Sequence, residues 1–319
     1  MRAIVIYEKG GPEVLKLEHD YPIPQPKSGW VVIQVKAFGL NRSEMFTRQG
    51  HSPGVQFPRV LGIEAAGLVA VDSGVFKKGE IVVTAMGGMG RDFDGGYAEY
   101  TCIPEAQVIK LQTTLPWEVL GALPEMMQTA WGSLNTALQL KAGDKLLIRG
   151  GTTGIGLAAA SLAKNRGAFV VSTTRKADRA DFLKQHGVDE VWLDDGRIGQ
   201  EVGKKFAGFN KVLELIGVST MVDSFQALDE HGILCVTGIA GGTWSLDDFN
   251  PMEKIPVARY LTVYSGGPED LRKTPLQDIV KDWENGRIKL PIKTFSMEQI
   301  VEAHTFMEKQ GGAKVVILV

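Results

Sequence analysis

A glycine-rich run between two apolar stretches constrains this chain more than any other feature. Residues 146–148 predict a short buried strand, residues 150–156 predict a tight turn, and the small-residue run 157–166 predicts a helix. Residues 169–171 predict a second strand, which completes a βαβ unit. Glycines in such a turn let the backbone approach a ligand closely, and the helix N-terminus offers N–H groups to an anion.

The spacing of the glycines favours a dinucleotide over a plain structural turn. The pattern G-x-x-G-x-G fits, whereas in a strict G-x-G-x-x-G pattern Thr153 replaces the middle glycine. A strand before the turn and a helix after it support a pyrophosphate site. A tight turn without a ligand is the alternative. The residues expected at the cofactor are Gly151, Thr152, Thr153, Gly154, Ile155 and Gly156.

The residues after the second strand indicate which dinucleotide is bound. A site for NAD places a carboxylate there, against the ribose 2′-hydroxyl. This chain has Thr173, Thr174 and Arg175 instead, with Arg179 one helical turn further on. Cations and hydroxyls suit a 2′-phosphate, so we predict NADPH. The alternative is a solvated basic start to a surface helix.

Composition excludes several classes of protein. The chain has 319 residues, a net charge of −2 and 44% hydrophobic residues, which predicts two domains with a large core. Near-neutral charge does not favour nucleic acid or an anionic membrane as partner. Two distant cysteines, no signal peptide and no apolar run of 18 residues lead us to expect a cytoplasmic protein.

The chain divides into a β-rich part and a part in which strands and helices alternate. Short strands separated by Gly and Pro predict an irregular β-barrel over residues 1–121. Alternation over residues 122–264 predicts a doubly wound parallel sheet. We expect residues 265–319, which end in an apolar strand, to return to the first domain. Gly217 and Gly238, each after a predicted strand, stand at the sheet edge where ligands bind in such folds, although ordinary turns would use glycine too.

Motifs spread over almost the whole length resemble one family. The chain resembles the medium-chain dehydrogenase/reductase superfamily, and within it the zinc-independent quinone oxidoreductases. The matching segments, in family order, are residues 10–15 (GGPEVL), 39–41 (GLN) with Glu44 and Arg48, 57–67, 95–100 (GGYAEY), the turn 151–156, 302–304 (EAH) and 314–316.

This resemblance implies a GroES-like barrel as catalytic domain, a Rossmann cofactor domain and a homodimer. It implies a cleft between the domains, with Asn41 near the nicotinamide and Thr129 on the cofactor from the other side. Arg48 would bind pyrophosphate or substrate, or lie on a solvated helix face; Asn41 would act at the site or only cap the helix after it. Phe46 stands where relatives often have a tyrosine, so a phenolic proton donor is missing.

The same comparison argues against a catalytic metal. Zinc-dependent relatives carry a histidine between the glycine and the glutamate of a G-H-E segment, and Ile63 stands there in this chain. They also have a cysteine ligand near the position of Asn41 and Ser43. Catalytic zinc requires three protein ligands, so we predict no metal.

The predicted reaction is hydride transfer from NADPH to a quinone or a similar conjugated carbonyl. The first alternative is reduction of the double bond of an enone or enoyl thioester. A second, from another class, is an NADPH-binding regulatory protein. His51, in a Gly/Pro loop, is a candidate acid or a plain surface residue. Trp244 and Phe249 could line a substrate wall or an interface.

Overall fold

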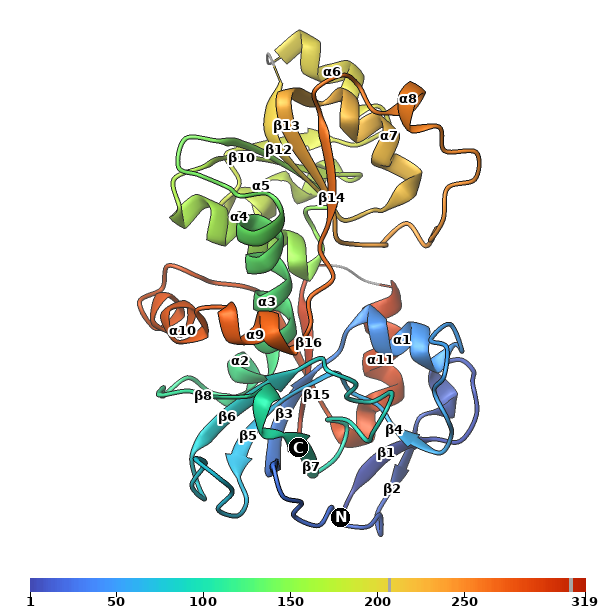
Figure 1. Ribbon diagram of the computed structural model, residues 1–319, viewed down its shortest axis with the longest axis vertical. Helices are drawn as coiled ribbons and strands as arrows, with labels where there is room; N and C mark the ends of the chain where they lie inside the picture. The colour runs from blue at the N-terminus through green and yellow to red at the C-terminus, as the bar shows by residue number, and fades with distance from the viewer. Residues whose placement is uncertain (206–207, 310–311) are drawn as a thin grey trace. The chain divides into compact units, whose positions relative to one another are not determined.

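The computed structural model describes residues 1–205, 208–309 and 312–319 and separates into two compact units (Figure 1). The first unit contains residues 1–128, 266–284 and 291–319. The second contains residues 129–265 and 285–290. Each unit is therefore built from segments that are far apart in the sequence.

The second unit is built on a six-stranded parallel sheet (Figure 1). The strand order is β11-β10-β9-β12-β13-β14. The first strand in the sequence, β9, lies inside the sheet; β10 and β11 follow on one side of it, and β12, β13 and β14 on the other, as in doubly wound dinucleotide-binding sheets. This confirms the predicted parallel sheet. The strands are β9 (Lys145–Arg149), β10 (Phe169–Thr174), β11 (Glu190–Leu193), β12 (Phe209–Glu214), β13 (Leu228–Val236) and β14 (Tyr260–Val263).

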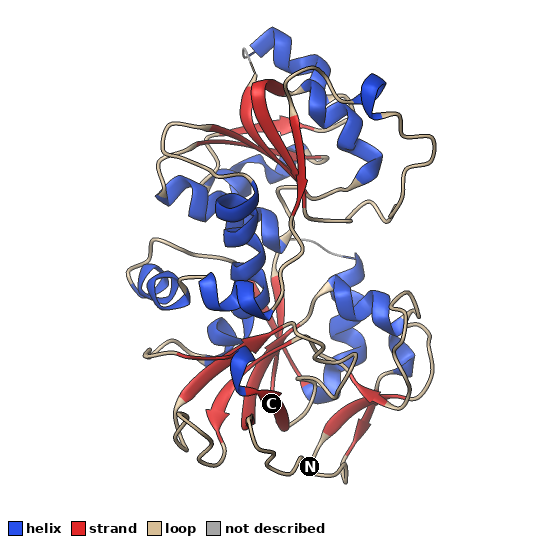
Figure 2. Cartoon of the chain, viewed as in Figure 1, coloured by secondary structure: helices blue, strands red, loops and turns tan. Residues whose placement is uncertain are grey.

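Helices alternate with these strands because each parallel crossover needs one (Figure 2). Small side chains on α4 (Gly154–Asn165) are buried, so this helix packs closely on β9 and β10. The sequence pattern over residues 198–206 predicts a helix, and the structure has α6 (Ile198–Lys205) there; the end of the predicted helix lies outside the described residues. The other helices are α5 (Ala180–Lys184), α7 (Val218–Gln226) and α8 (Pro251–Lys254), with the 3-10 turn η4 (Ala177–Arg179).

The first unit contains a seven-stranded sheet and a three-stranded sheet. The large sheet has the order β15-β16-β3-β5-β6-β8, with β7 also paired to β3; the small sheet has the order β2-β1-β4. The strands of the first unit are β1 (Ala3–Ile6), β2 (Lys16–Glu18), β3 (Trp30–Gly39), β4 (Arg59–Val60), β5 (Glu64–Val69), β6 (Ile81–Ala85), β7 (Tyr100–Pro104), β8 (Val108–Lys110), β15 (Ile292–Ser296) and β16 (Lys314–Leu318).

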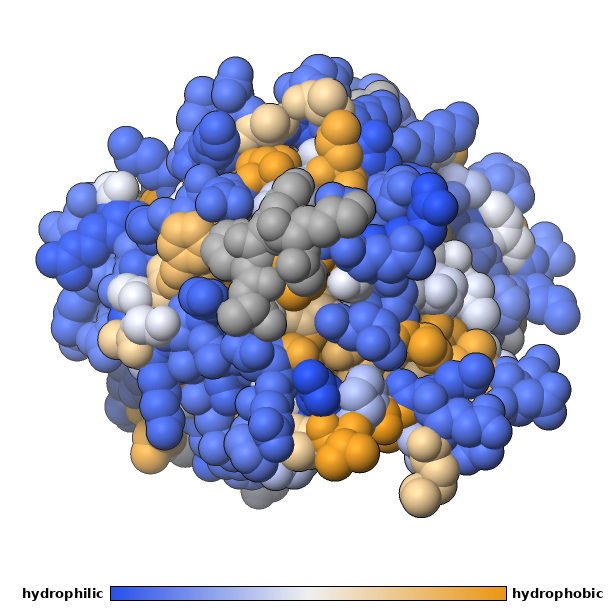
Figure 3. All heavy atoms as spheres, turned by 90° about the horizontal axis from the view of Figure 1, so that it is seen from above, coloured by the Kyte–Doolittle hydropathy of each residue, from blue (hydrophilic) through white to orange (hydrophobic). Residues whose placement is uncertain are grey.

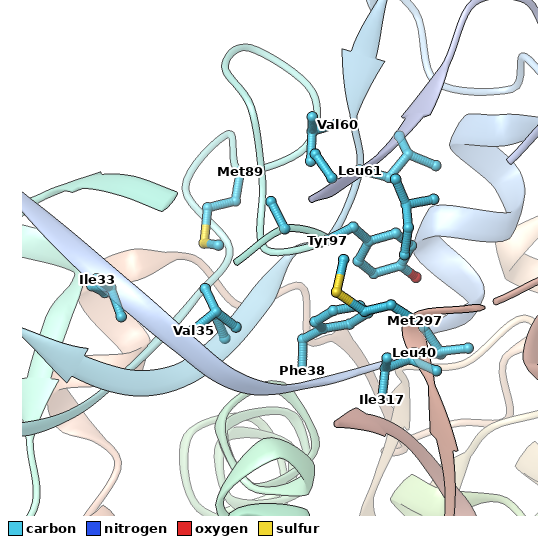
Figure 4. Close-up of a cluster of buried hydrophobic side chains, with 14 of the residues drawn as sticks. Ile33, Val35, Phe38, Leu40, Val60, Leu61, Met89, Tyr97, Met297 and Ile317 are labelled. Atoms are coloured by element: carbon cyan, nitrogen blue, oxygen red, sulfur yellow. The ribbon is translucent and has the colours of Figure 1, made fainter. Parts of the chain in front are cut away.

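The central strand β3 explains how distant segments join this sheet. It pairs antiparallel with β5, β7 and β16, so the last strand lies beside the first long one. The two sheets enclose a hydrophobic core, in which the rings of Phe38 and Tyr97 stack 4.6 Å apart (Figure 4). The sequence predicts an irregular barrel. Among the described residues, the two outermost strands of the large sheet, β15 and β8, are not paired with each other, so the sheet is open.

Short helices connect the strands of the first unit. Helical spacing over residues 120–138 predicts one helix, which Pro124 divides. The first unit has α2 (Trp117–Ala122) and the start of α3 (Pro124–Gly132), whereas the end of α3 and the π-helical turn η3 (Ser133–Ala137) belong to the second unit. The remaining helical elements are η1 (Pro12–Val14), α1 (Arg42–Arg48), η2 (Glu105–Gln107), α9 (Pro268–Lys273), α10 (Leu276–Glu284), η5 (Met297–Gln299) and α11 (Ile300–Lys309).

The surface carries charged side chains with separate apolar patches among them, as one face in Figure 3 shows. Cys102 and Cys235 are both buried and unpaired. None of the described helices has the length and apolarity needed to cross a membrane.

Candidate functional site

The glycine-rich turn has the geometry expected of a phosphate cradle. Gly150 has a φ of +91°, and a Cβ on Gly151 would lie 1.7 Å from the Ser172 hydroxyl oxygen. A Cβ on Gly156 would lie 2.8 Å from two backbone carbonyl oxygens of the turn. Side chains are therefore excluded at these positions, and the backbone itself forms the surface that a ligand would meet.

Thr153, which replaces the middle glycine of the strict pattern, begins the helix. Its hydroxyl accepts a hydrogen bond from the Gly156 N–H at 3.0 Å and donates to the Gly150 carbonyl at 2.9 Å. It is thus the N-cap of α4 and also closes the turn. Thr152, Gly154 and Ile155 are half-buried at the start of this helix, whose first N–H groups have no intrahelical acceptor.

The end of β10 carries the residues predicted to hold a 2′-phosphate. Thr173 and Thr174 are buried, Arg179 is half-buried over the Phe182 ring, and Arg175 is exposed. The Thr173 hydroxyl accepts from the Gly150 N–H at 3.2 Å, which ties β10 to the glycine-rich turn. Arg175 and Arg179 therefore lie at the same edge of the second unit's sheet as the glycine-rich turn.

Sequence reasoning missed a carboxylate at this edge. Asp194, directly after β11, accepts a hydrogen bond from the Thr173 hydroxyl at 3.2 Å. The fully buried guanidinium of Arg149 holds both its carboxylate oxygens, at 2.8 and 2.9 Å. Burial acts to raise the pKa of Asp194, but Arg149 outweighs it and keeps the pKa below its ordinary value. The charge of Asp194 is consequently already neutralised inside the protein.

Arg149 is the last residue of β9, the strand that leads into the turn, and its other contacts extend the network. It donates to the Asp223 carboxylate at 2.7 Å and to the Ser224 hydroxyl at 3.0 Å. A charged residue that ends an otherwise apolar strand was the sequence signal for this network. It links β9, the end of β11 and α7 around the predicted cofactor site.

Thr129 and Gly238 also belong to the second unit. The Ser133 hydroxyl donates to the Thr129 carbonyl at 2.7 Å and lies 2.9 Å from the Thr237 hydroxyl, next to Gly238. A Cβ on Gly238 would lie 2.4 Å from the Leu215 carbonyl oxygen, so glycine is required there. These contacts connect α3 to the carboxyl end of β13, and Gly217 begins α7 at the neighbouring strand end.

The first unit contains a buried ion cluster, which we define as Asn41, Glu44, Glu64, Glu125 and Lys314. The Lys314 ammonium lies 2.7 Å from the Glu64 carboxylate and 3.9 Å from that of Glu125. It also donates to the Asn41 amide oxygen, and the Asn41 amide nitrogen donates to Glu64 at 2.9 Å. Burial alone would lower the pKa of Lys314, but Glu64 and Glu125 outweigh it and raise the pKa.

Glu44 is, like Glu64, almost completely buried. It accepts hydrogen bonds from the backbone N–H groups of Asn41 and Ile63, both at 3.0 Å. Burial raises the pKa of Glu44 to about 7. The Asn41 side chain is therefore held by Lys314 and Glu64, while Glu44 bonds to the Asn41 backbone at the start of α1.

The other two predicted catalytic residues lie on the same helix. Arg48 is fully buried, donates to the Gly10 carbonyl at 2.7 Å and pairs with Glu308. The interpretation of Arg48 as a residue on a solvated face is therefore wrong. Burial lowers its pKa. Phe46 is half-buried, and the exposed ring of His51 lies 6.3 Å from it, edge to face.

Comparison with known proteins places both units in described families. Residues 27–113 match the alcohol dehydrogenase GroES-like domain, and residues 154–275 match the zinc-binding dehydrogenase family. A quinone oxidoreductase of Pongo abelii is 30% identical over 325 aligned positions, 98% of this chain and 95% of its own.

Two further similarities concern substrate and cofactor. An acryloyl-coenzyme A reductase of Sulfurisphaera tokodaii is 24% identical and covers 99% of both chains. A mycobacterial protein solved in complex with NADPH has a TM-score of 0.86 and 25% identity, and the match covers 100% of both chains.

The ion cluster makes a direct prediction about stability. Lys314→Met removes the only ammonium among the described members of the cluster and leaves buried carboxylates without a counter-charge. We expect the free energy of unfolding to fall by about 3–5 kcal/mol, measured by urea denaturation. The exposed Lys281, which pairs with Asp278, is the control: Lys281→Met should change stability by less than about 0.5 kcal/mol. Equal, small effects of both substitutions would contradict the role given to the cluster.

Proposed function

The chain belongs to the quinone oxidoreductase branch of the medium-chain dehydrogenase/reductase superfamily, as its motifs predict, and we propose that it transfers hydride from NADPH to a quinone or a similar conjugated carbonyl. The observation that carries this proposal is the turn over residues 151–156 followed by a strand end with two arginines, Arg175 and Arg179, where the carboxylate that contacts Thr173, Asp194, is paired with Arg149. That arrangement fits a dinucleotide with a phosphate on its ribose.

A bound nicotinamide dinucleotide supplies the hydride. In this proposal, the backbone from Gly151 to Gly156 and the N-terminus of α4 bind its pyrophosphate. Arg175 and Arg179 bind the 2′-phosphate, and Thr173 and Thr174 form the wall beside them. Thr129 and Gly238 contact the cofactor along the same edge of the sheet. The support for NADPH over NADH is that Arg149 already engages Asp194, the carboxylate that accepts a hydrogen bond from Thr173.

We propose further that the reaction needs no metal. Ile63 stands where the resemblance implies a histidine ligand in zinc-dependent relatives, and no cysteine stands near Asn41 and Ser43. The Lys314 ammonium supplies positive charge among the carboxylates of the cluster. Charge that develops on the acceptor then has to spread through the acceptor itself. A conjugated carbonyl allows this, which is why a quinone or an enone is the proposed substrate class.

The three residues of α1 and its N-cap have different roles in this proposal. Asn41 presents an amide whose orientation is fixed by Lys314 and Glu64. Phe46 contributes apolar surface and no proton. Arg48, paired with Glu308 and bound to the Gly10 carbonyl, positions α1 through its buried contacts.

The similarity to an acryloyl-coenzyme A reductase favours a second candidate function, reduction of the double bond of an enoyl thioester. The two candidates differ in the acceptor, and they share the cofactor. An NADPH-binding regulatory protein is the third candidate, and it differs from both because it would bind the cofactor without turnover.

The decisive experiment follows NADPH and NADH absorbance at 340 nm with 1,4-naphthoquinone, a simple enone and acryloyl-coenzyme A as separate acceptors. We expect the quinone to give the fastest oxidation, and NADPH to be used in preference to NADH. Faster turnover of the enone or the thioester would establish the second candidate. Tight NADPH binding without turnover of any acceptor would establish the regulatory protein and overturn the first proposal.

The cofactor preference is tested separately by Arg175→Ala combined with Arg179→Ala. Loss of two charge-assisted contacts should weaken NADPH binding by about 10- to 100-fold and leave NADH binding nearly unchanged, because only NADPH carries the 2′-phosphate. Cofactor fluorescence titration measures both affinities. Arg197→Ala is the control, since Arg197 is an exposed arginine of the same unit that pairs with Asp195. An equal loss for both cofactors would count against the 2′-phosphate site.

We also propose a homodimer that forms through β14. This strand is at the edge of the sheet, and its side chains Tyr260, Leu261 and Val263 are 52%, 39% and 66% exposed. An unpaired apolar edge of this kind favours pairing with a second copy. Val263→Lys should convert the dimer to a monomer in light scattering coupled to size exclusion, whereas Val75→Lys, at an exposed valine of the first unit, should not. A dimer that persists in Val263→Lys would exclude this interface.

A further inference from the structure

A closed ring of contacts beside the glycine-rich turn consists of Arg149, Gly150, Thr173 and Asp194. Arg149 directly precedes Gly150, whose N–H donates to the Thr173 hydroxyl oxygen at 3.2 Å. The same hydroxyl donates to the Asp194 carboxylate, also at 3.2 Å. Arg149 closes the ring with two hydrogen bonds to that carboxylate, at 2.8 and 2.9 Å. Only one side chain therefore separates the carboxylate from the backbone of the turn.

Asp194 also lies beside the strand end that is proposed to bind the 2′-phosphate. Its backbone N–H donates to the Thr174 carbonyl at 2.9 Å, and Thr174 directly precedes Arg175. The Asp194 side chain is 10% exposed, whereas that of Arg149 is fully buried. The acidic side chain thus reaches the surface at this edge of the sheet, and the guanidinium that neutralises it does not.

The charge of a carboxylate at this edge bears on the choice of cofactor. A carboxylate after the second strand is typical of sites for NAD, where it accepts a hydrogen bond from the ribose 2′-hydroxyl. The same charge opposes a 2′-phosphate, because like charges repel strongly where water is partly excluded. In this chain the acidic residue follows the third strand, β11, and Arg149 balances its charge. Arg175 and Arg179 can then attract a phosphate without opposition from Asp194.

A second carboxylate of the network provides an internal comparison. Asp223, within α7, accepts a hydrogen bond from Arg149 at 2.7 Å and from the Gly199 N–H at 3.2 Å. Gly199 belongs to α6. Among the hydrogen bonds of the described residues, none joins the Asp223 carboxylate to β10 or to the glycine-rich turn. Arg149 therefore neutralises one carboxylate that contacts the cofactor edge and one that does not.

From these contacts we infer that Arg149 is a specificity-determining residue: it neutralises Asp194 and thereby allows this strand end to accept a 2′-phosphate. Because its guanidinium is fully buried, Arg149 acts through Asp194 and does not touch the ligand. The inference rests on the proposed NADPH site, and it adds that the choice between NADPH and NADH depends on an ion pair inside the protein.

The test measures the dissociation constants of NADPH and NADH by cofactor fluorescence titration in three variants of the full-length protein. Arg149→Met removes the charge and keeps most of the length of the side chain. The second variant combines Arg149→Met with Asp194→Asn, which also removes the negative charge next to Thr173. The third combines Arg149→Met with Asp223→Asn and is the matched control, because it removes the carboxylate that does not contact β10.

Arg149→Met should raise the dissociation constant of NADPH about tenfold or more and that of NADH less than about threefold, because only NADPH carries the 2′-phosphate. Adding Asp194→Asn should return the NADPH constant to within about threefold of that of the unmodified protein, and adding Asp223→Asn should not. Each double variant retains one of the two carboxylates. Their comparison therefore decides the question even where Arg149→Met alone does not fold.

Three results would overturn the inference and leave Arg149 a structural role. They are a preference for NADPH that survives Arg149→Met, an equal loss of both cofactors in that variant, and recovery that is not specific to Asp194→Asn. Failure of the proposed function is seen separately, in the unmodified protein: if it binds NADH as tightly as NADPH, the proposed cofactor is wrong.

Discussion

The ion pair between Lys314 and Glu64 is the interaction on which the first unit depends. It joins the start of the last strand, β16, to the start of β5, across 250 residues of sequence. Both side chains are buried, so neither charge is stable without the other. The Asn41 amide lies between them and bonds both, which fixes the beginning of α1 relative to two strands. Stability of the sheet and orientation of a predicted site residue thus have one physical origin.

The second unit uses the same device at the predicted cofactor site. Arg149 is buried at the end of β9 and neutralises Asp194, which follows β11, and Asp223, which lies within α7. The turn that follows Arg149 needs few side chains of its own, because the ion pairs of Arg149 with Asp194 and Asp223 fix the position of the residue that precedes it. A backbone cradle for an anion needs this kind of support, since glycine alone gives freedom and no rigidity.

The sequence predicts the repeating parts of this structure well. Alternation of apolar runs and helical spacing predicts the parallel sheet, and the glycine spacing predicts the turn before α4. The ion cluster could not be predicted in this way, because Asn41 and Lys314 are 273 residues apart and neither lies in a local pattern that specifies the other. The signals were single charged residues at the ends of apolar stretches, such as Glu64 before the alanines of β5, Lys314 before the four aliphatic residues 315–318, and Arg149 after the leucines of β9. The burial of Arg48 could not be predicted either, because an arginine on a short helix is usually exposed and only the tertiary packing of this unit buries it.

The interleaving of the two units constrains how the chain can fold during synthesis. The chain passes from one unit to the other after residues 128, 265, 284 and 290. Strand β3 is made early, but its neighbour β16 consists of residues 314–318. Until those residues leave the ribosome, residues 37–39 of β3 lack their partner and Glu64 lacks its ammonium. The described strands of the second unit are all made by residue 263, so this unit can fold before the first. A nascent chain would then carry a folded parallel sheet together with an unfinished antiparallel sheet that is open to chaperones and to aggregation.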